Sequence, residues 1–263
     1  MAKGDKTSLG DRIKEYESVS KTTLVRRMPV FIRLDGKAFH TFCRHFHKPF
    51  DPIMAGAMQD TMLYLCRNIQ NCVLGYTQSD EITLVLIDYK NINTGVWFNN
   101  EVQKMVSVSA SMATYAFSKA HERRTNQAWA AYCNGNNDIS EKVLVEHIRQ
   151  TQTGLPFFDS RIFNVPENDC ENAVYWRQLD AIRNSKTALA LSVFSHNELY
   201  GKSGEDKVTM VKKKTGILWN NLPIWQQRGC CAIKDENDWK LDLNIPVFKG
   251  EGRGYITKQI KAE

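Results

Sequence analysis

The sequence lacks any apolar run of about 18 or more residues, so no transmembrane helix is expected. It also lacks a Walker-type phosphate loop and a Rossmann glycine pattern, which excludes the two best-known glycine-rich nucleotide sites. No Ser-His-Asp arrangement stands out, and no repeat or Pro/Gly/Ser-rich linker divides the chain. These absences predict a soluble globular protein without a membrane partner.

Disulfide-forming patterns are absent too. The seven cysteines are an odd number and contain no C-x-x-C pair. Residues 1–17 are polar and mixed in charge, which is not the pattern of a secretory signal. We therefore expect reduced thiols and a cytoplasmic protein.

Composition and charge leave several partners open. A chain of 263 residues, 42% hydrophobic and 24% charged, can bury a sizeable core. It forms either one large domain or one domain with an elaboration. Its 35 basic and 29 acidic residues give a net charge of +6. This mild excess permits an anionic partner such as RNA or nucleoside triphosphates but does not prove one.

Two adjacent carboxylates, Asp80 and Glu81, stand directly before the apolar run of residues 82–87. Like charges side by side repel each other unless a positive group lies between or beside them. A polar hairpin turn is one explanation, and a divalent metal ion is the other. A third carboxylate, Asp35, ends the strand-like run VFIRL and is followed by Gly36.

The order of elements predicts an α+β fold of the ferredoxin-like type, β-α-β-β-α-β. Asp51-Pro52 is typical of a helix N-cap followed by proline at the first helical position. The expected strands are 30–34, 72–76 and 82–88, with WAAYC (129–133) and FFDSRIFNV (157–165) as further candidates, and the expected helices are 52–69 and 100–123.

In this arrangement the first and third strands are neighbours at the centre of the sheet. The end of the first strand then lies near the hairpin between the second and third. Asp35 and Asp80 would meet there on one metal site. Adjacent side chains of an extended chain face opposite sides. We therefore assign Asp80 to the metal side together with Asp35, and Glu81 to a supporting or structural role.

Beyond about residue 175 the pattern becomes more helical. Residues 195–206 are expected to be a loop with glycines, and residues 216–240 to end in a pair of strands. We expect residues 1–170 to form the catalytic core. Residues 171–263 are expected to be a substrate-facing elaboration that does not fold independently.

The segment 35–40, DGKAFH, offers further ligand contacts. Gly36 allows a close backbone approach, and Lys37 and His40 can face anionic phosphate. An ordinary Asp-Gly turn explains the same residues.

Other single features are equally open. Asp51 is chiefly an N-cap, although a helix N-terminus also attracts phosphate. Lys104 and Ser111 share one helix face and either meet a triphosphate or are simply a solvated lysine and a packing serine. The run Lys212–Lys214 either meets a phosphate backbone or is a solvated edge. Zinc bound by Cys43, His45 and His47 is rejected, because a fourth ligand is missing.

Several motifs together resemble the tRNA-histidine guanylyltransferase family and its guanylyltransferase-like relatives, the 3′-to-5′ polymerases. The similar segments extend from about residue 30 to residue 219. They are RLDGKAFHTF (33–42), KPFD (48–51), YTQSDE (76–81), KMVSVSAS (104–111), FDSR (158–161) and YWRQLDAIRNS (175–185).

The resemblance implies a polymerase-like palm with two Mg²⁺ ions held by Asp35, the Gly36 carbonyl and Asp80. It implies catalytic roles for Asp35, Asp80 and Glu81, ATP and GTP as substrates, and a homotetramer. ATP or GTP would activate a 5′-monophosphorylated tRNA, whose 5′ end the 3′-hydroxyl of the next nucleotide attacks. The implied nucleotide contacts are Arg33, Asp35, Gly36, Lys37, Ala38, Phe39, His40, Lys48, Asp51, Ser79, Asp80, Lys104 and Ser111. The expected tRNA contacts are Arg161, Arg183 and Lys214.

One departure from the family pattern bears on the substrate. The histidine-specific enzymes carry a His-Ile-Asn-Asn motif, whereas this sequence has Ile182-Arg183-Asn184-Ser185. The difference favours the branch that repairs 5′-truncated tRNAs on a template. Thr77 and Ser160 also stand where glycine is usual. Addition of a single guanylate to tRNA-histidine is the alternative. A palm-type nucleotidyl cyclase and a non-catalytic RNA-binding module are the rivals from other classes.

Overall fold

A computed structural model describes residues 7–235 and 238–261 of the chain. Its α-helices are α1 (Leu9–Ser18), α2 (Phe39–Phe42), α3 (Pro52–Asn68), α4 (Val102–Cys133), α5 (Glu141–Thr153), α6 (Cys170–Leu191), α7 (His196–Leu199), α8 (Gly204–Thr215), α9 (Ile224–Arg228) and α10 (Gly254–Ile260). Its strands are β1 (Val30–Gly36), β2 (Cys72–Gln78), β3 (Glu81–Leu86), β4 (Phe158–Asn164), β5 (Cys230–Asp235) and β6 (Asp238–Asp242). Short 3-10 helices lie at Trp97–Asn100, Glu167–Asp169, Trp219–Asn221 and Gly250–Arg253.

These strands form a six-stranded sheet in the order β4-β1-β3-β2-β5-β6, and every neighbouring pair is antiparallel. The first and third strands are therefore neighbours, as the sequence predicted. The β5–β6 hairpin, from the last part of the chain, joins the sheet beside β2. The fold is thus mixed α/β, with one antiparallel sheet. Strands β1 to β4 come from residues 30–164, and β5 and β6 come from residues 230–242.

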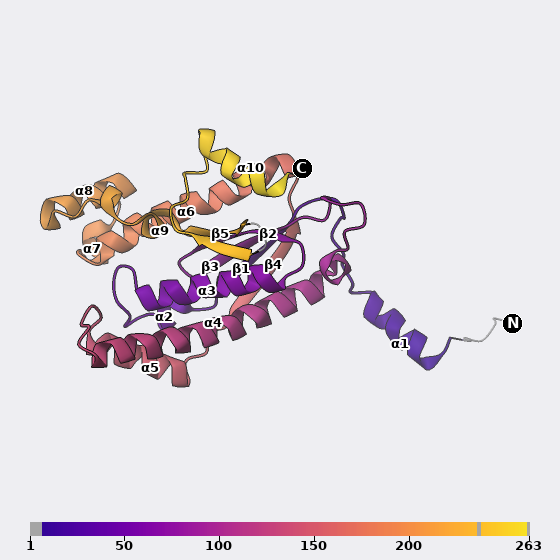
Figure 1. The fold of residues 1–263 in the computed structure, drawn as a ribbon, viewed down its shortest axis with the longest axis horizontal. Helices are drawn as coiled ribbons and strands as arrows, with labels where there is room; N and C mark the ends of the chain where they lie inside the picture. Colours follow the sequence, from indigo (N-terminus) through magenta and orange to yellow (C-terminus); the bar gives the residue numbers. More distant parts are fainter. Residues whose placement is uncertain (1–6, 236–237, 262–263) are drawn as a thin grey trace.

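Helices cover both sides of the sheet (Figure 1). α3 and α4 pack on one side, named here the α3 face, and α6 and α10 on the other, named the α6 face. Ile32 and Leu34 of β1 belong to the core on the α3 face, whereas Phe31 belongs to the core on the α6 face. Because strand residues alternate in direction, Arg33 and Asp35 also point to the α6 face.

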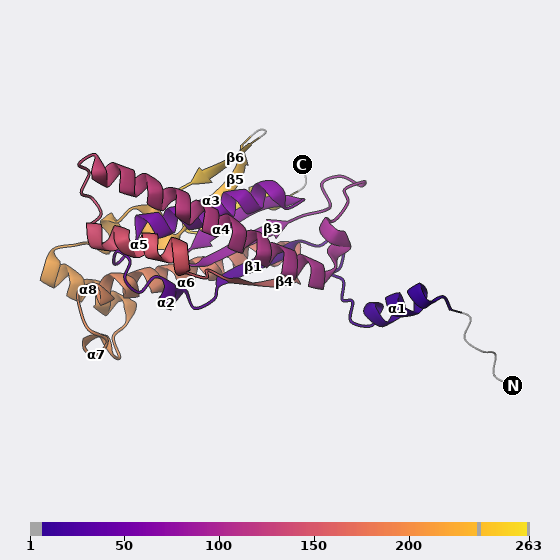
Figure 2. The ribbon, with the colours of Figure 1, turned by 90° about the horizontal axis from the view of Figure 1, so that it is seen from below.

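The view from the α4 side shows α4 and α5 in front of the sheet (Figure 2). α1 extends away from the rest of the protein in both views, and none of its residues is buried. Among the described residues, no helix combines the length and the apolar character needed to cross a bilayer.

The start of α3 confirms the predicted cap. The Asp51 carboxylate accepts a hydrogen bond from the Met54 backbone N–H at 2.8 Å, and Pro52 occupies the first helical position. Met58, Met62 and Leu65 then face the core at helical spacing. The strand predicted at residues 157–165 is also present, as β4.

One predicted strand is wrong. Residues 129–133 belong to α4, which continues to Cys133 instead of ending near Arg123. Aromatic and small residues suggested a strand, but they suit a helix surface equally well. The rings of Trp129 and Tyr132, three residues apart, meet at 5.9 Å as helical neighbours do.

The loop predicted at residues 195–206 is wrong as well. It contains α7 and the first turn of α8. Ser195 and Ser203 each begin one of these helices with a capping box, in which serine and a carboxylate exchange hydrogen bonds with the backbone. Gly201 lies between the two helices, and Gly204 is the first residue of α8, so neither glycine interrupts a helix.

Candidate active site

Asp35 and Asp80 meet at one end of the sheet. Asp35 lies near the end of β1, and Asp80 lies in the turn between β2 and β3. The Gly36 backbone N–H donates a hydrogen bond to the Asp80 carbonyl oxygen at 3.0 Å and joins the two segments. Burial raises the pKa of Asp80, and the nearby charge of Asp35 raises it further. The structure therefore brings together the two carboxylates that the sequence singled out.

Little positive charge compensates this pair. Among the described residues, no lysine or arginine forms an ion pair with Asp35 or Asp80. The Asp80 carboxylate accepts a hydrogen bond from Ser79 Oγ at 3.0 Å, and His40 lies near enough to oppose the rise in its pKa. Two partly buried like charges without a counter-charge are suited to binding a cation.

The loops that carry the two carboxylates have a constrained backbone. Ala38 and Ser79 both adopt left-handed conformations, with φ of 57° and 51°. Each costs about 1–2 kcal/mol for a residue with a side chain. Gly36 is required for space, because a Cβ there would lie 2.4 Å from the Phe39 ring. Core packing of Phe39 thus shapes the loop beside Asp35.

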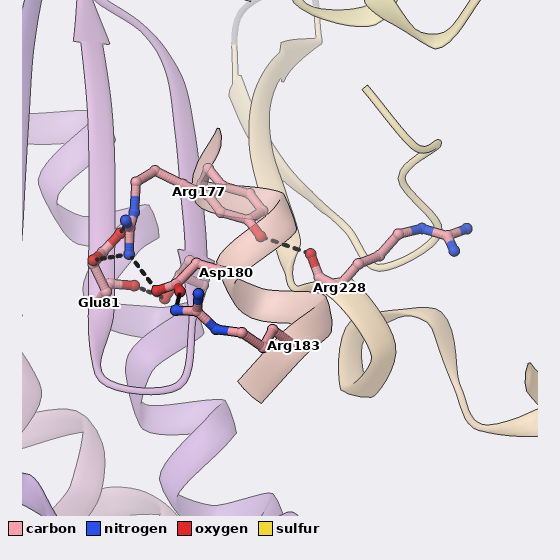
Figure 3. A network of polar contacts seen from close by, with 7 residues as sticks. Glu81, Arg177, Asp180, Arg183 and Arg228 are labelled. Carbon is pink, nitrogen blue, oxygen red and sulfur yellow. Dashed lines mark hydrogen bonds and ion pairs between the residues drawn. The ribbon is translucent and has the colours of Figure 1, made fainter. Parts of the chain in front are cut away.

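Glu81 has a different environment from its neighbour. Its two carboxylate oxygens accept hydrogen bonds from Arg177 Nε and Nη2 at 2.6 and 2.7 Å, and both side chains are buried. Arg177 also donates to Asp180, which pairs with Arg183 (Figure 3). Burial raises the pKa of Glu81, while the hydrogen bonds from Arg177 oppose that rise. Glu81 therefore holds α6 to β3.

The expected division of faces between Asp80 and Glu81 is wrong in one respect. β3 begins at Glu81, whose partner in the sheet is Asp35, so these two side chains share the α6 face. Asp80 lies in the turn, where the alternation of strand residues does not apply. Asp80 joins Asp35 because the turn closes on the end of β1.

A cavity of about 370 Å³ opens beside Asp80. Its walls are the segment between α2 and α3, the start of α3, the β2–β3 turn, α6 and α9. Phe50 and Trp225 meet there edge to face, with ring centres 6.4 Å apart, and Asn184 and Gln226 add amide groups. Apolar walls with a few polar groups are typical of a small-molecule site.

Most of the predicted nucleotide contacts lie either in the cavity wall or in the loop beside it. Those that line the cavity are Phe39, His40, Lys48, Asp51, Ser79 and Asp80. Asp35, Gly36, Lys37 and Ala38 belong to the adjoining strand end and loop, outside the cavity wall. Arg33 lies on β1 two residues before Asp35, on the same face of the sheet.

Lys104 and Ser111 lie apart from the cavity, exposed on α4. Lys104 Nζ lies 5.9 Å from the centre of the Phe98 ring, and Ser111 Oγ donates to the Ser107 carbonyl oxygen. Their contact with a triphosphate stays a prediction.

Asp51 forms the end of a buried polar chain. Its carboxylate accepts from His47 N–H at 2.9 Å and contacts His147 Nε2 at 3.0 Å, and His147 Nδ1 contacts His121 Nε2 at 2.9 Å. Burial by itself raises the pKa of Asp51, but these hydrogen bonds lower it below its ordinary value. Burial lowers the pKa of His121 to about 3. The chain therefore fixes the segment that forms one wall of the cavity.

The predicted tRNA contacts are exposed but dispersed. Arg161 lies on β4, with its guanidinium 3.5 Å from Asp159. Arg183 pairs with Asp180 on α6. Lys214, near the end of α8, donates a hydrogen bond from Nζ to the Val193 carbonyl oxygen. They do not form one cluster, and their role stays a prediction.

The two residues that replace glycine have structural partners. Thr77 Oγ1 donates to the Glu81 carbonyl oxygen at 2.8 Å across the β2–β3 hairpin. Ser160 Oγ and Ser109 Oγ lie 2.8 Å apart and join β4 to α4. Both hydroxyls are thus used within the fold.

The donor set at the strand end fits magnesium. Mg²⁺ prefers hard oxygen ligands and usually keeps several waters, so it needs only one or two carboxylates from the protein. Asp35 and Asp80 supply these, and the unneutralised charge at Asp80 favours a cation there. In the described residues no three His, Cys, Asp or Glu side chains form a metal-binding group, so a purely protein-made cage is not present.

Several residues of the site escaped sequence reasoning. Arg177 lies in the segment YWRQLDAIRNS (175–185), but its partner Glu81 is distant in the sequence. His121 and His147 carried no local signal at all. Asp159 is the direct partner of Asp35 across β1 and β4. Only the strand register, which the sequence did not specify, reveals it.

The fold is of the mixed α/β class with one antiparallel sheet, and two carboxylate residues, Asp35 and Asp80, lie together at one end of that sheet. The sequence profile of the family described as tRNAHis guanylyltransferase (Thg1) matches residues 10–166. Since this is more than half of the chain, the protein belongs to the tRNAHis guanylyltransferase family. The predicted resemblance is confirmed.

Individual relatives support this membership. A bacterial tRNA(His) guanylyltransferase (Thg1)-like protein solved in complex with ATP is 34% identical, with a TM-score of 0.83 over 97% of this chain and 100% of that one. A structure of a protein with the same description in complex with GTP is 33% identical, with a TM-score of 0.74 over 95% and 98%. An uncharacterized protein of Acanthamoeba polyphaga mimivirus is 29% identical over 86% of this chain and 77% of its own. A probable tRNA(His) guanylyltransferase of Dictyostelium discoideum is 26% identical over 84% and 80%.

Proposed function

We propose that the protein is a template-directed 3′-to-5′ nucleotidyltransferase that adds nucleotides to the 5′ end of truncated tRNA. The observation that carries this proposal is the pair Asp35 and Asp80, which has no ion-pair partner among the described residues and lies at one end of the sheet beside a cavity of about 370 Å³. Membership of the tRNAHis guanylyltransferase family supports the choice of a tRNA 5′ end as substrate.

We further propose that β4-β1-β3-β2 with α3 and α4 form a ferredoxin-like palm of the polymerase type, within residues 1–170. The strand order and the position of the acids at the end of the sheet support this. Residues 171–263 would then be the substrate-facing part, through α6 and α9, which line the cavity.

Two Mg²⁺ ions would be held by Asp35, the Gly36 carbonyl and Asp80. When bound, they supply neutralisation of the charge that develops on the entering and leaving oxygens of nucleotidyl transfer. The residues of the chain orient the reactants. Ser79 and the left-handed backbone at Ala38 hold the two carboxylate loops in place, and Glu81 with Arg177 fixes β3 beside them.

The cavity is proposed to hold a nucleoside triphosphate. Structural relatives were solved with ATP and with GTP, which supports both as substrates. Phe50 and Trp225 offer apolar surface for a base, and Lys48 and His40, which also line the cavity, would attract the phosphates. Positioning and electrostatics then suffice for transfer, without a protein nucleophile.

The reaction requires an activated 5′ end. The 5′-monophosphate of the RNA attacks the α-phosphorus of ATP or GTP, and pyrophosphate leaves. The 3′-hydroxyl of the next nucleotide then attacks the activated 5′ phosphorus and displaces the nucleoside monophosphate. Assembly as a homotetramer and a cytoplasmic location stay predictions.

Repair of several tRNAs is favoured over guanylate addition to tRNA-histidine alone. Ile182 replaces the histidine of the histidine-specific motif. The neighbouring Asn184 and Ser185 line the cavity, and Ser185 Oγ accepts a hydrogen bond from Trp219 Nε1. The family description itself favours the alternative, a single 5′ guanylate on tRNA-histidine.

A direct assay separates these functions. Several 5′-monophosphorylated tRNAs, each lacking the first nucleotide, are incubated with Mg²⁺, ATP and all four nucleoside triphosphates beside full-length tRNA-histidine. Restoration of the complementary nucleotide on several tRNAs is expected. Extension of tRNA-histidine alone supports the single-guanylate alternative. Binding of triphosphate without any RNA product contradicts the polymerase proposal and favours a cyclase or a binding module.

A further inference from the structure

We propose that a partly exposed strip of the sheet over β1 and β4 holds the 5′ end of the RNA, with a base stacked on Trp176 and phosphate groups at Arg33 and Arg161. The inference rests on the proposed function and names the surface that receives the RNA. The β1–β4 strip is defined by the pairs Asp35–Asp159, Arg33–Arg161 and Phe31–Phe163.

Each of these pairs joins two residues directly opposite each other in the antiparallel register. Directly opposite side chains lie on the same face of the sheet. Since Phe31 belongs to the core on the α6 face, all three pairs point to that face. On β4 the residues of the strip are exposed, whereas the alternate residues are half-buried or buried against the α3 face.

The first unusual property of the strip is that each of its three cross-strand pairs, named here rows, joins two residues of the same type: two aspartates, two arginines and two phenylalanines. Opposite positions that carry the same charge destabilise an antiparallel sheet. Within the described residues, Arg161 reaches only Asp159, at 3.5 Å and with both side chains 52% exposed, which is a weak ion pair. Nor does any carboxylate of the described residues form an ion pair with Arg33. A ligand that brings both anionic groups and a cation would relieve both charged rows.

The second property is an incomplete set of hydrogen bonds in the basic row. In the part of the chain that the structure describes, the buried Arg33 Nε has no hydrogen-bond partner, and neither has the Thr83 hydroxyl, which is directly opposite on β3. Buried polar groups are usually satisfied, so each exception costs free energy. The chain itself therefore does not complete this row, and phosphate oxygens are suitable acceptors for the arginine.

The third property is an exposed aromatic ring held in place beside the strip. The Trp176 side chain on α6 is 56% exposed. The guanidinium carbons of Arg177 and Arg33 lie 4.3 and 5.7 Å from its ring. Arg177 is itself fixed by the buried Glu81. Because the Trp176 ring lies against this fixed guanidinium, the Trp176 side chain loses little entropy when a base stacks on it. Aromatic rings beside cations are the usual elements of single-strand binding.

The order of the rows fits an RNA end. Phe163, 39% exposed, supplies aromatic surface at one end, Arg33 and Arg161 follow along the strands with the Trp176 ring beside Arg33, and Asp35 and Asp159 come last. Successive rows are two residues and therefore roughly 6.6 Å apart, since strands rise about 3.3 Å per residue. Base, phosphate and reactive 5′ end can thus lie in sequence along the strip.

Asp80 connects the strip with the cavity. It lines the cavity wall, and its carbonyl oxygen accepts a hydrogen bond at 3.0 Å from the N–H of Gly36, which directly follows Asp35 at the acidic end of the strip. A triphosphate in the cavity and an RNA end on the strip would therefore approach the same carboxylates from two sides. An apolar protein segment is a poorer occupant, because it would leave both like-charged rows uncompensated.

Binding of a 5′-monophosphorylated tRNA that lacks its first nucleotide tests the inference. Fluorescence anisotropy on the full chain compares wild type with Trp176→Ala, Trp176→Phe and Tyr115→Ala. Tyr115 is a matched control, since it is 58% exposed but lies on α4. Trp176→Ala is expected to weaken RNA binding roughly 10-fold, the loss of one stacked base. Trp176→Phe should stay within about 3-fold of wild type, and ATP affinity should not change.

The basic row has its own test. Arg161→Gln is expected to weaken RNA binding and to lower the slope of log affinity against log salt by about 1. Arg123→Gln is the control, because Arg123 is comparably exposed at 57% but pairs with Asp60 on the α3 face. Equal salt slopes for the two variants and wild type would overturn the assignment of phosphates to this row.

The outcomes distinguish this inference from the proposed function. If wild type extends the RNA and Trp176→Ala binds it as tightly as Tyr115→Ala, the strip is not the RNA site, although the function stands. If wild type binds ATP but neither binds nor extends RNA, the function fails and the inference fails with it. A folded Trp176→Ala that loses RNA affinity while keeping ATP affinity supports the inference.

Discussion

Asp80 and Glu81 are neighbours in sequence but opposites in environment. Glu81 is buried and clamped by two hydrogen bonds from Arg177, and its charge is matched. Asp80 faces Asp35 with no ion-pair partner among the described residues, and burial together with that charge raises its pKa. Asp51 resembles Glu81, since backbone N–H groups and His147 satisfy it. The comparison teaches that the matched acids hold the fold, whereas the unmatched acids remain available for the proposed metal site.

The largest expected effect comes from neutralising the unmatched acids. Asp35→Asn and Asp80→Asn should each lower the rate of 5′ extension by roughly 10³-fold or more, because the charge that attracts the metal is lost. The melting temperature should stay the same or rise slightly, since a like-charge repulsion is removed. Single-turnover kinetics and thermal unfolding measure the two effects. A large drop in melting temperature would show that these acids are structural.

Breaking the matched pair should have the reverse result. Arg177→Met leaves Glu81 buried without its cation and should lower the free energy of unfolding by about 3–5 kcal/mol. Urea denaturation checks this. The double variant with Glu81→Gln should recover part of the loss, because no uncompensated charge remains.

Arg183→Ala is the matched control for that experiment. Arg183 pairs with the same Asp180, but its side chain is 74% exposed. Its removal should cost less than about 1 kcal/mol. Equal losses for Arg177→Met and Arg183→Ala would contradict the assigned role of the buried pair.

The histidine chain behind Asp51 predicts a pH dependence of stability. Burial lowers the pKa of His121 to about 3, whereas an unfolded histidine titrates near 6.5. Below that value the unfolded state binds one more proton. Stability is therefore fully present above about pH 6.5 and falls as the pH drops, by up to about 1.4 kcal/mol per unit. The lowered pKa of Asp51 adds a further loss in more acidic solution.

Replacement of the buried histidine sharpens this prediction. His121→Gln keeps an amide near His147 but removes the titration, so the decline of stability between pH 6.5 and pH 4 should become shallower. The exposed His196 on α7 provides the control His196→Gln, which should leave the slope unchanged. Denaturant midpoints across this range are the measurement, and identical slopes for wild type and His121→Gln would refute the account.

The smallest effect is expected for a neutral pair on the α3 face, on the other side of the sheet from the side chains of Asp35 and Asp159. Ser160→Ala removes the hydrogen bond to Ser109 between β4 and α4. The cost should be about 1 kcal/mol in the free energy of unfolding, with little change in extension rate. A double-mutant cycle with Ser109→Ala isolates this interaction, and additivity of the two losses would show that the hydroxyls do not interact.

Much of the central sheet was predictable, because local signals were strong there. The pair Asp51-Pro52 predicted the start of α3, and Asp35 and Asp80 were predicted as carboxylates at strand ends. Residues 129–133 misled, since aromatic and small residues suit helix and strand alike. Local sequence does not report tertiary context.

The supporting residues of the site were not predictable for a related reason. Glu81 meets Arg177, and Asp51 meets His147, only after chain segments far apart in sequence have packed together. Strand register, which pairs Asp35 with Asp159, depends on the same packing. Motifs thus located the unmatched acids, and the fold had to supply their neighbours.

The most direct test of the central claim is calorimetric titration of ATP with and without Mg²⁺, for wild type and Asp80→Asn. The account predicts that Mg²⁺ tightens ATP binding by wild type at least about 10-fold, since the metal joins phosphate to the unmatched acids. Asp80→Asn should lose most of this gain while remaining folded. An equal gain in both proteins, or no gain in wild type, would contradict the claim that these carboxylates are the metal site.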